Sequence, residues 1–194
     1  MGRLVNTFEL MELALSDEAQ MAQLSSHPEW RVRYAAAIGM GETRDARWLP
    51  TLFALMKREA DRDLYGQPRV KEFVGSYDDT LAAEQLVSTR AIWDKEPTAE
   101  QRDDWQCRGR VRQAAILAVH SIGQRDPDWE QLLIEVLQDR SEDSVVRTAA
   151  AKALSRIGAE ASIAPLRDAL QIDEWCLAIE VRKSLRALGE MVND

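Results

Sequence analysis

The sequence predicts an all-α fold, a solenoid of about four to five antiparallel helical pairs with one long insertion. Three observations predict it. A Val-Arg pair followed by small residues recurs along the chain, its last three copies are evenly spaced, and prolines recur in the first turn of the helices between them. The sequence predicts helices almost throughout and no sheet.

The clearest copy of the pattern is residues 141–158, SEDSVVRTAAAKALSRIG. Its apolar residues fall at helical spacing on one face: Val146, Ala149, Ala150, Ala153, Leu154 and Ile157. Alanine costs little to order in a helix and lets a neighbouring helix approach closely. Asp143 and the serines beside it suit the start of this helix, and Gly158 suits its end.

The pattern recurs in residues 109–123 and, more loosely, in residues 29–41 and 180–189. The anchors Val111, Val146 and Val181 are separated by two steps of 35 residues, which is typical of a helical array. The step from Val32 to Val111 is 79 residues, one period plus about 44 residues. An insertion is therefore expected between these two units.

The remaining helices are expected from apolar stripes and breakers. A first helix over 8–14 would cap the array, because a terminal repeat faces water. Pro50 and Pro165 each lie in the first turn of an expected outer helix, where a missing N–H costs nothing. The expected helices after the first span residues 17–27, 29–41, 45–60, 109–122, 128–140, 144–157, 163–170 and 175–192.

A Pro-Leu outer helix paired with a D-x-x-V-R-x-A-A-x-A-L-x-x-I-G inner helix resembles HEAT repeats. More narrowly, it resembles the short HEAT-like repeats of phycobilisome lyase proteins. The best matches are Asp143–Gly158 and Arg108–Gly123, and the resemblance covers most of the chain outside residues 61–105. It implies a right-handed α–α superhelix with the Val-Arg helices on the concave side. Such repeats serve scaffolds, lyases, enzymes and assembly factors, so the resemblance does not select a function.

The insertion, residues 61–105, has eleven acidic and six basic residues and five of the twelve aromatic residues. Residues 78–92 are expected to form a helix, and the capping-box pattern Thr98-x-x-Gln101 is expected to begin another. The segment is either an ordered insertion or a mobile acidic loop, and its aromatic residues favour order. In the ordered case, Tyr77 and Trp93 are candidate contacts to a partner.

Composition fits one domain over residues 1–194, with 45% hydrophobic and 30% charged residues. The two cysteines form no CxxC, which fits a reducing, cytoplasmic location. No N-terminal apolar segment and no run of 18 apolar residues occurs, so neither secretion nor membrane spanning is expected.

No catalytic, cofactor-binding or metal-binding residue is predicted. His27 precedes Pro28 in an expected surface turn, and His120 has no Cys or His nearby in sequence that would complete a metal site. Neither an HExxH motif nor a nucleotide-binding glycine loop is present in the sequence.

Cations are concentrated on the inner helices. The arginines that follow the valine anchors, Arg33, Arg112, Arg147 and Arg182, are expected to pair with an acidic residue of the adjacent unit. A basic strip on the concave face is expected to bind a partner. Its candidate residues are Arg112, His120, Lys152, Arg156, Lys183 and Arg186.

Three functions are compatible with these features. The first is a scaffold or adaptor that binds another protein through an acidic or mixed-charge segment. The second is a role like that of phycobilin lyases or chromophore-protein chaperones, although no bilin-binding motif is present. The third is a HEAT-like DNA-binding or DNA glycosylase-like protein, against which the net charge of −8 and the pI near 4.9 argue.

Overall fold

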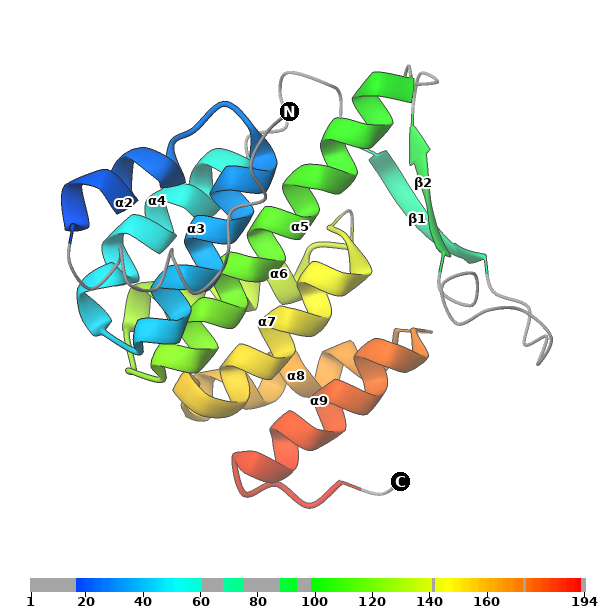
Figure 1. Cartoon of the computed structure of the whole chain (residues 1–194). Coiled ribbons are helices and arrows are strands. Elements are labelled where there is room, and N and C mark those ends of the chain that lie inside the picture. The colour runs from blue at the N-terminus through cyan, green and yellow to red at the C-terminus, as the bar shows by residue number, and fades with distance from the viewer. Residues whose placement is uncertain are drawn as a thin grey trace, which may run out of the picture.

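The computed structural model describes residues 17–60, 68–74, 88–93, 99–140, 142–172 and 174–192. These residues form a helical solenoid (Figure 1). The first helix expected from the sequence, residues 8–14, lies outside the described residues.

Four inner helices lie side by side in chain order, each in contact with the next (Figure 1). They are α3 (Trp30–Thr43), α5 (Ala99–Ile122), α7 (Ser144–Ile157) and α9 (Trp175–Ala187). An outer helix packs against each inner one: α2 (Glu18–Ser25), α4 (Leu49–Ala60), α6 (Pro127–Gln138) and α8 (Ile163–Ala169). Short 3₁₀ turns, η1 (Ala46–Trp48) and η2 (Glu160–Ser162), lead into α4 and α8. Helical pairs repeated in this way confirm the predicted fold class.

Short acidic side chains begin several of these helices. Asp17 caps α2, Asp126 caps α6 and Asp143 caps α7, each by accepting a backbone N–H of the first turn. The chain turns out of α5 at Gly123, whose φ of 71° is left-handed and favours glycine. The sequence signals for helix boundaries therefore correspond to real hydrogen bonds and dihedral angles.

Small side chains form part of the core between the inner helices. Ala36, Ala115 and Ala150 are each 0% exposed, as the shared alanine pattern predicted. At α9 the pattern substitutes Ser184, whose buried hydroxyl donates to the Ala151 carbonyl of α7 at 2.8 Å. At Gly41 α3 comes close to α5, because a Cβ there would lie 2.7 Å from Cα of Ala118. Small residues at these positions thus allow neighbouring inner helices to pack closely.

The outer layer contains the large side chains. Trp48 and Trp129 are 0% and 1% exposed. The Trp129 indole donates to the Leu49 carbonyl at 3.2 Å and meets Phe53 edge-to-face, with ring centroids 5.4 Å apart. Aromatic packing therefore connects α4 and α6, which are far apart in sequence because the insertion separates them.

The insertion differs from the expectation in two ways. Strands β1 (Pro68–Val74) and β2 (Ser88–Trp93) form an antiparallel pair, in which Val70 faces Ile92 and Phe73 faces Thr89. The expectation of no sheet is therefore wrong, and the helix expected over 78–92 is wrong for residues 88–92. Both segments are rich in β-branched and aromatic residues, which favour strands.

The second difference is the extent of α5. It runs without a break from Ala99, so the helix expected at the capping-box pattern and the inner helix expected over 109–122 are one helix, and residues 99–105 belong to it and not to the insertion. The capping-box pattern thus marks the start of the inner helix itself. Of the candidate insertion contacts, Trp93 belongs to β2 and Tyr77 lies outside the described residues. Among the described helices, none is both long enough and apolar enough to span a membrane.

Candidate binding surface on the inner helices

Each of the first three inner helices buries one arginine against a glutamate. Arg33 of α3 forms a two-pronged ion pair with Glu59 of α4, at 2.6 Å from Nε to Oε1 and 3.0 Å from the second nitrogen to Oε2. Its remaining nitrogen donates to the backbone carbonyls of His27 and Pro28, just after α2. Such paired, hydrogen-bonded charges are tolerated in an interior because few donors remain unsatisfied.

The arrangement repeats at α5 and α7. Arg112 donates to the Glu142 carboxylate at 2.7 Å and to the Glu59 carbonyl at 2.6 Å. Arg147 donates to the Glu174 carboxylate at 2.8 Å and to the Leu137 carbonyl at 3.0 Å. In each case the carbonyl ends the outer helix of the same pair, and the carboxylate precedes the next inner helix. We call these three contacts the Arg–Glu joints.

The joints confirm the predicted pairing for Arg33, Arg112 and Arg147. Burial lowers the pKa of Arg147 below its ordinary value, while the neighbouring Glu174 acts to raise it. Arginine stays charged well above neutral pH, so the pair remains ionic. Arg182 is half-buried, and no ion pair joins it to any residue within the described ranges.

Arg112 does not belong to the binding strip in which the sequence placed it. Its side chain is 0% exposed, and both ends of its guanidinium are held by Glu59 and Glu142. The residue that follows the valine anchor points into the seam between units, where no partner reaches it. Its correct role is the structural one that the ladder of arginines also predicted.

The other predicted cations lie at the surface. Lys152, Arg156, Lys183 and Arg186 are all exposed. Lys183 lies 3.7 Å from Glu180, one turn earlier on α9. Arg186 lies 3.4 Å from the Val192 carbonyl. We call the exposed Lys152, Arg156 and Lys183 of α7 and α9 the basic strip, and its role in binding a partner stays a prediction.

His120 of α5 lies beside this strip and is half-buried. Burial lowers its pKa, the charges of Lys152 and Arg156 lower it further, and the Lys152 backbone and Glu180 act in the opposite direction. Its Nδ1 is buried and has no hydrogen-bond partner among the residues that the structure describes. The structure thus brings His120 of α5 close to Lys152 and Arg156 of α7.

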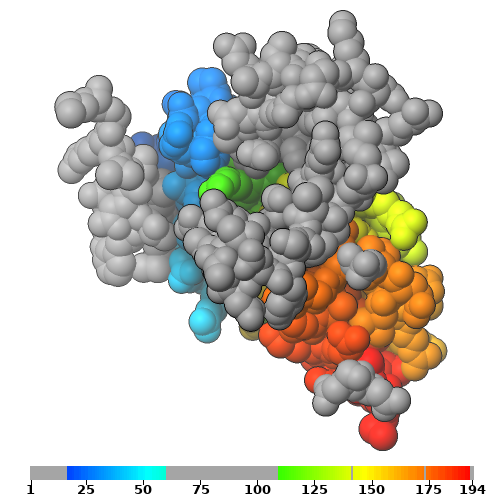
Figure 2. Space-filling view, turned by 90° about the vertical axis from the view of Figure 1, so that its right-hand side faces the viewer, coloured from blue at the N-terminus to red at the C-terminus, as the bar shows by residue number. Residues whose placement is uncertain are grey.

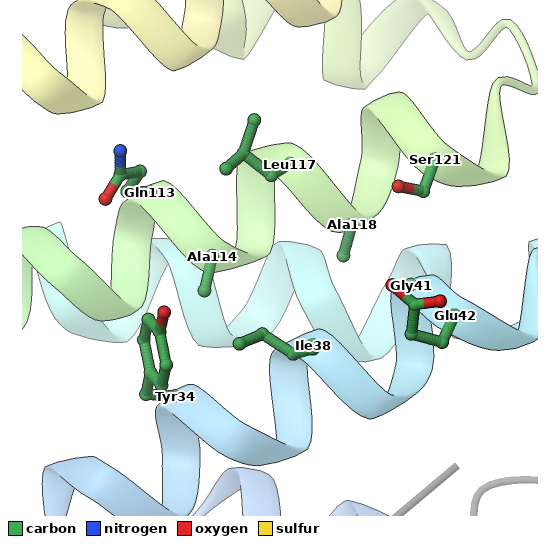
Figure 3. A pocket seen from close by; sticks show the side chains of 9 residues that line it. All are labelled: Tyr34, Ile38, Gly41, Glu42, Gln113, Ala114, Leu117, Ala118 and Ser121. Carbon is green, nitrogen blue, oxygen red and sulfur yellow. The ribbon is translucent and has the colours of Figure 1, made fainter. Parts of the chain in front are cut away.

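A groove lies between α3 and α5 (Figure 3). Its volume is about 190 Å³ and its walls are mainly apolar. Ala114 and Ala118 of α5 point toward α3, where Tyr34 and Ile38 form the opposite wall, and Leu117 of α5 also lines the groove. The close Gly41–Ala118 contact brings these helices together beneath the groove. Glu42, Gln113 and Ser121 supply its polar edge.

Apolar side chains are also exposed at the C-terminal end of the array. Figure 2 shows the surfaces of α8 and α9, orange to red, open at that end. Trp175 and Ile179 of α9 are 49% and 39% exposed, and Val145 of α7 is 42% exposed. Together with the basic strip they give the inner helices a mixed apolar and cationic surface, a composition common in interfaces.

Sequence reasoning missed the groove. Four of its residues occupy the same two positions relative to the valine anchors. Tyr34 and Gln113 each come two residues after an anchor, and Ile38 and Leu117 each come six residues after it. These positions lie outside the apolar face that packs into the core. An apolar residue at such a position could have indicated a contact at the surface. In the described ranges, no three His, Cys, Asp or Glu side chains gather as a metal site would require.

The comparisons with known proteins agree with the helical repeats. Residues 103–189 match a family model described as HEAT repeats. The match begins within α5 and ends just after α9, so it covers the three Val-Arg helices with 35-residue spacing. No curated protein sequence matches the chain. The narrower resemblance to phycobilisome lyase repeats stays a prediction.

Proposed function

We propose that the protein is an interaction scaffold or adaptor whose inner helices bind a segment of another protein. HEAT repeats generally mediate protein–protein interactions, and the match over residues 103–189 supports that class of function. The observation that carries the proposal is the surface of α3, α5, α7 and α9. It combines an apolar groove, exposed apolar side chains and a basic strip on adjacent helices.

Charge favours an acidic or mixed-charge protein segment as the ligand. Lys152, Arg156 and Lys183 form a local basic strip on a chain whose net charge is −8. A strip of this kind orients an acidic partner and speeds its association. The overall negative charge opposes a nucleic acid, because a duplex repels an acidic protein over a much larger area. The acidic insertion, through Tyr77 and Trp93, is proposed to contribute at the edge of this surface.

The Arg–Glu joints suit such a surface to binding without large rearrangement. The joints of Arg112 and Arg147 each link an inner helix to the end of the outer helix of its own pair and to the segment just before the next inner helix. A rigid surface loses little conformational entropy when a partner docks, so more of the contact energy appears as affinity. The joints therefore support the inner surface, although they do not contact the partner.

Affinity capture with charge-reversed surfaces tests the proposal. Tagged wild-type protein and the variants Lys152→Glu, Lys183→Glu and Lys57→Glu are used to capture partners from an extract of the source cells. Lys57 lies exposed on outer helix α4, so its reversal controls for the change of net charge. We expect the two inner-helix variants to lose a partner that Lys57→Glu retains.

Association kinetics with that partner provide the second measurement. Reversal at Lys152 should slow association and flatten its dependence on salt, because the steering charge is removed. Equal rates for wild type, Lys152→Glu and Lys183→Glu at low salt would show that the inner surface is not the binding surface. The outer helices would then be the place to look for it.

A further inference from the structure

Three basic side chains meet where α5 passes α7. His120 belongs to α5, and Lys152 and Arg156 belong to α7. The Arg156 guanidinium lies against the end of α5, since a Cβ on Gly123 would be 2.2 Å from its Nε. Lys152 and Arg156 are both exposed and form no ion pair with a described residue. Glu180 of α9 is the acidic group that acts on His120 at this place.

The apolar groove adjoins this basic cluster along the same helix. Leu117 and Ser121 line the groove, and His120 lies between them in sequence. Residues three apart on a helix are neighbours, with Cβ atoms roughly 5–6 Å apart. A chain crossing α5 therefore meets the groove on the α3 side and the basic cluster on the α7 side within about two or three extended residues, at about 3.3 Å per residue.

The groove has room for one side chain. Its volume is about 190 Å³. A cavity of about 150 Å³ lined by apolar groups holds a benzene molecule. Tyr34, Ile38 and Leu117 line the groove together with Ala114 and Ala118, so an aliphatic or aromatic group meets mainly apolar atoms there. A buried apolar anchor of this kind is what fixes the register of a bound peptide.

We propose that α5 carries a composite peptide site, in which the α3–α5 groove takes one apolar side chain and His120, Lys152 and Arg156 take a nearby carboxylate. The occupant is a partner-protein segment with a leucine-like residue two positions from a pair of acidic residues. This site rests on the proposed function and specifies the chemistry of the segment that the inner helices bind. Charge complementarity selects the acidic residues, and the apolar lining selects the anchor.

Binding at this site should depend on pH. In the free protein, burial and the two neighbouring cations oppose protonation of His120, and the Lys152 backbone and Glu180 only partly offset them. A bound carboxylate adds a negative charge beside the imidazole and so favours its protonated form. By linkage, lowering the pH from about 7.5 to about 5.5 strengthens binding while the peptide carboxylates stay ionised.

The test is a titration of the isotopically labelled full chain, followed by amide NMR spectra. The probe is the peptide acetyl-Leu-Ser-Glu-Glu-amide, also made in reversed order. Matched probes replace both glutamates by glutamine, or leucine by alanine. We expect saturable shifts in α3, α5 and α7 with the first peptide, and affinity about fivefold lower or worse for each matched probe.

Variants separate the two halves of the site. Lys152→Glu and Arg156→Glu should weaken the acidic peptide about fivefold or more and leave the glutamine peptide unchanged. Leu117→Ser should weaken both. Lys57→Glu on α4 is the matched charge control and should leave all affinities within about twofold. His120→Gln should abolish the gain in affinity at lower pH. Unchanged amide shifts far from the site verify that each variant folds.

Several results would overturn the composite site. Equal affinity for the glutamate and glutamine peptides would reject the carboxylate half, and equal affinity for the leucine and alanine peptides would reject the groove. Inorganic phosphate that binds the cluster with no peptide engaging the groove would leave an anion site only. Tighter binding of a short single-stranded oligonucleotide at the same residues would reject a peptide as the ligand.

Failure of this site is distinguishable from failure of the proposed function. If the peptides fail while capture of a partner still depends on Lys152 and Lys183, only the composite site is rejected. If capture is the same for every inner-helix variant, the proposed function is rejected, whatever the peptides do.

Discussion

The Arg112 guanidinium and the Glu142 carboxylate form an ion pair at 2.7 Å in which both side chains are almost wholly buried. The same guanidinium donates to the Glu59 carbonyl at the end of α4. One side chain thus ties α5 to the outer helix of its own pair and to the segment that begins α7. The contact holds neighbouring helical pairs together, and it requires that each of the two buried charges keep its partner.

Removing Glu142 should be strongly destabilising. Glu142→Ala leaves the Arg112 charge buried without its partner, which costs about 3–5 kcal/mol. The exposed pair of Arg31 and Glu29 provides the contrast, because its side chains are 72% and 47% exposed. Glu29→Ala should cost no more than about 1 kcal/mol. Urea unfolding followed by circular dichroism measures both.

A double variant shows whether the cost comes from the stranded charge. Replacing both partners by apolar residues, as in Arg112→Met with Glu142→Leu, removes the unpaired charge and should recover much of the lost stability. If Glu142→Ala and Glu29→Ala unfold at the same urea concentration, the buried pair does not stabilise the stack.

Gly41→Ala and Gly109→Ala should have opposite effects. A Cβ on Gly41 meets the Ala118 backbone at 2.7 Å, so α3 and α5 must move apart at a cost of about 1–3 kcal/mol. That exceeds the gain of about 0.5–1 kcal/mol for alanine over glycine within a helix. At Gly109 the nearest atom is 3.7 Å away, so only the gain remains. Thermal unfolding of the two variants should shift in opposite directions.

Ala150→Leu should overpack the seam between inner helices. Ala150 is 0% exposed on α7, and extra methylene groups there should cost about 1–3 kcal/mol. Ala164→Leu on α8 is the matched control, because Ala164 is exposed and both residues are good helix formers. Equal melting temperatures for the two variants would show that the assignment of Ala150 to the packed face is wrong.

The stability of the protein should fall in mild acid partly because of His120. Its folded pKa lies below the ordinary 6.5, so the unfolded chain binds the proton more readily. The stabilising contribution is therefore full above pH 6.5 and is lost as the pH falls through that value toward the folded pKa. Free energies of unfolding between about pH 7.5 and about pH 5.5 should decrease less in His120→Gln than in the wild type.

The comparison of the wild type with His120→Gln isolates the effect of His120, because carboxylates elsewhere in the chain titrate equally in both proteins. A parallel pH dependence for wild type and His120→Gln would contradict the prediction. His27→Gln serves as a second reference, since His27 lies in the exposed turn after α2 and accepts the Glu29 backbone N–H at 3.0 Å.

The repeats were predictable because their information is local. Val146 with Ala149 and Ala150 defines a helical face by spacing alone, and prolines and caps mark helix ends within a few residues. The Arg–Glu joints were predictable only in part. Translational symmetry implied that Arg112 and Arg147 meet equivalent residues, but the partners lie 30 and 27 residues away, at no fixed distance.

The groove and the strand pair were not predicted, for different physical reasons. Tyr34 and Leu117 are neighbours in space, but the insertion lies between them in sequence. Their separation along the chain therefore does not follow the repeat period. Val70 and Ile92 pair across a connection whose length does not follow the 35-residue period. Helix propensity over residues 78–92 competed with cross-strand pairing, and pairing prevailed for residues 88–92.

Because each Arg–Glu joint crosses the boundary between units, a unit supplies a carboxylate to one neighbour and a guanidinium to the other. Residues 124–158 contain the carboxylate of Glu142 for the unit before them and the guanidinium of Arg147 for the unit after them. Tandem duplication or deletion of this unit leaves every guanidinium facing a carboxylate, since Glu142 and Glu174 are both glutamates. Insertion or deletion of part of a unit leaves a buried charge without its partner. Selection against such unpaired charges would allow the array to lengthen or shorten only by whole units.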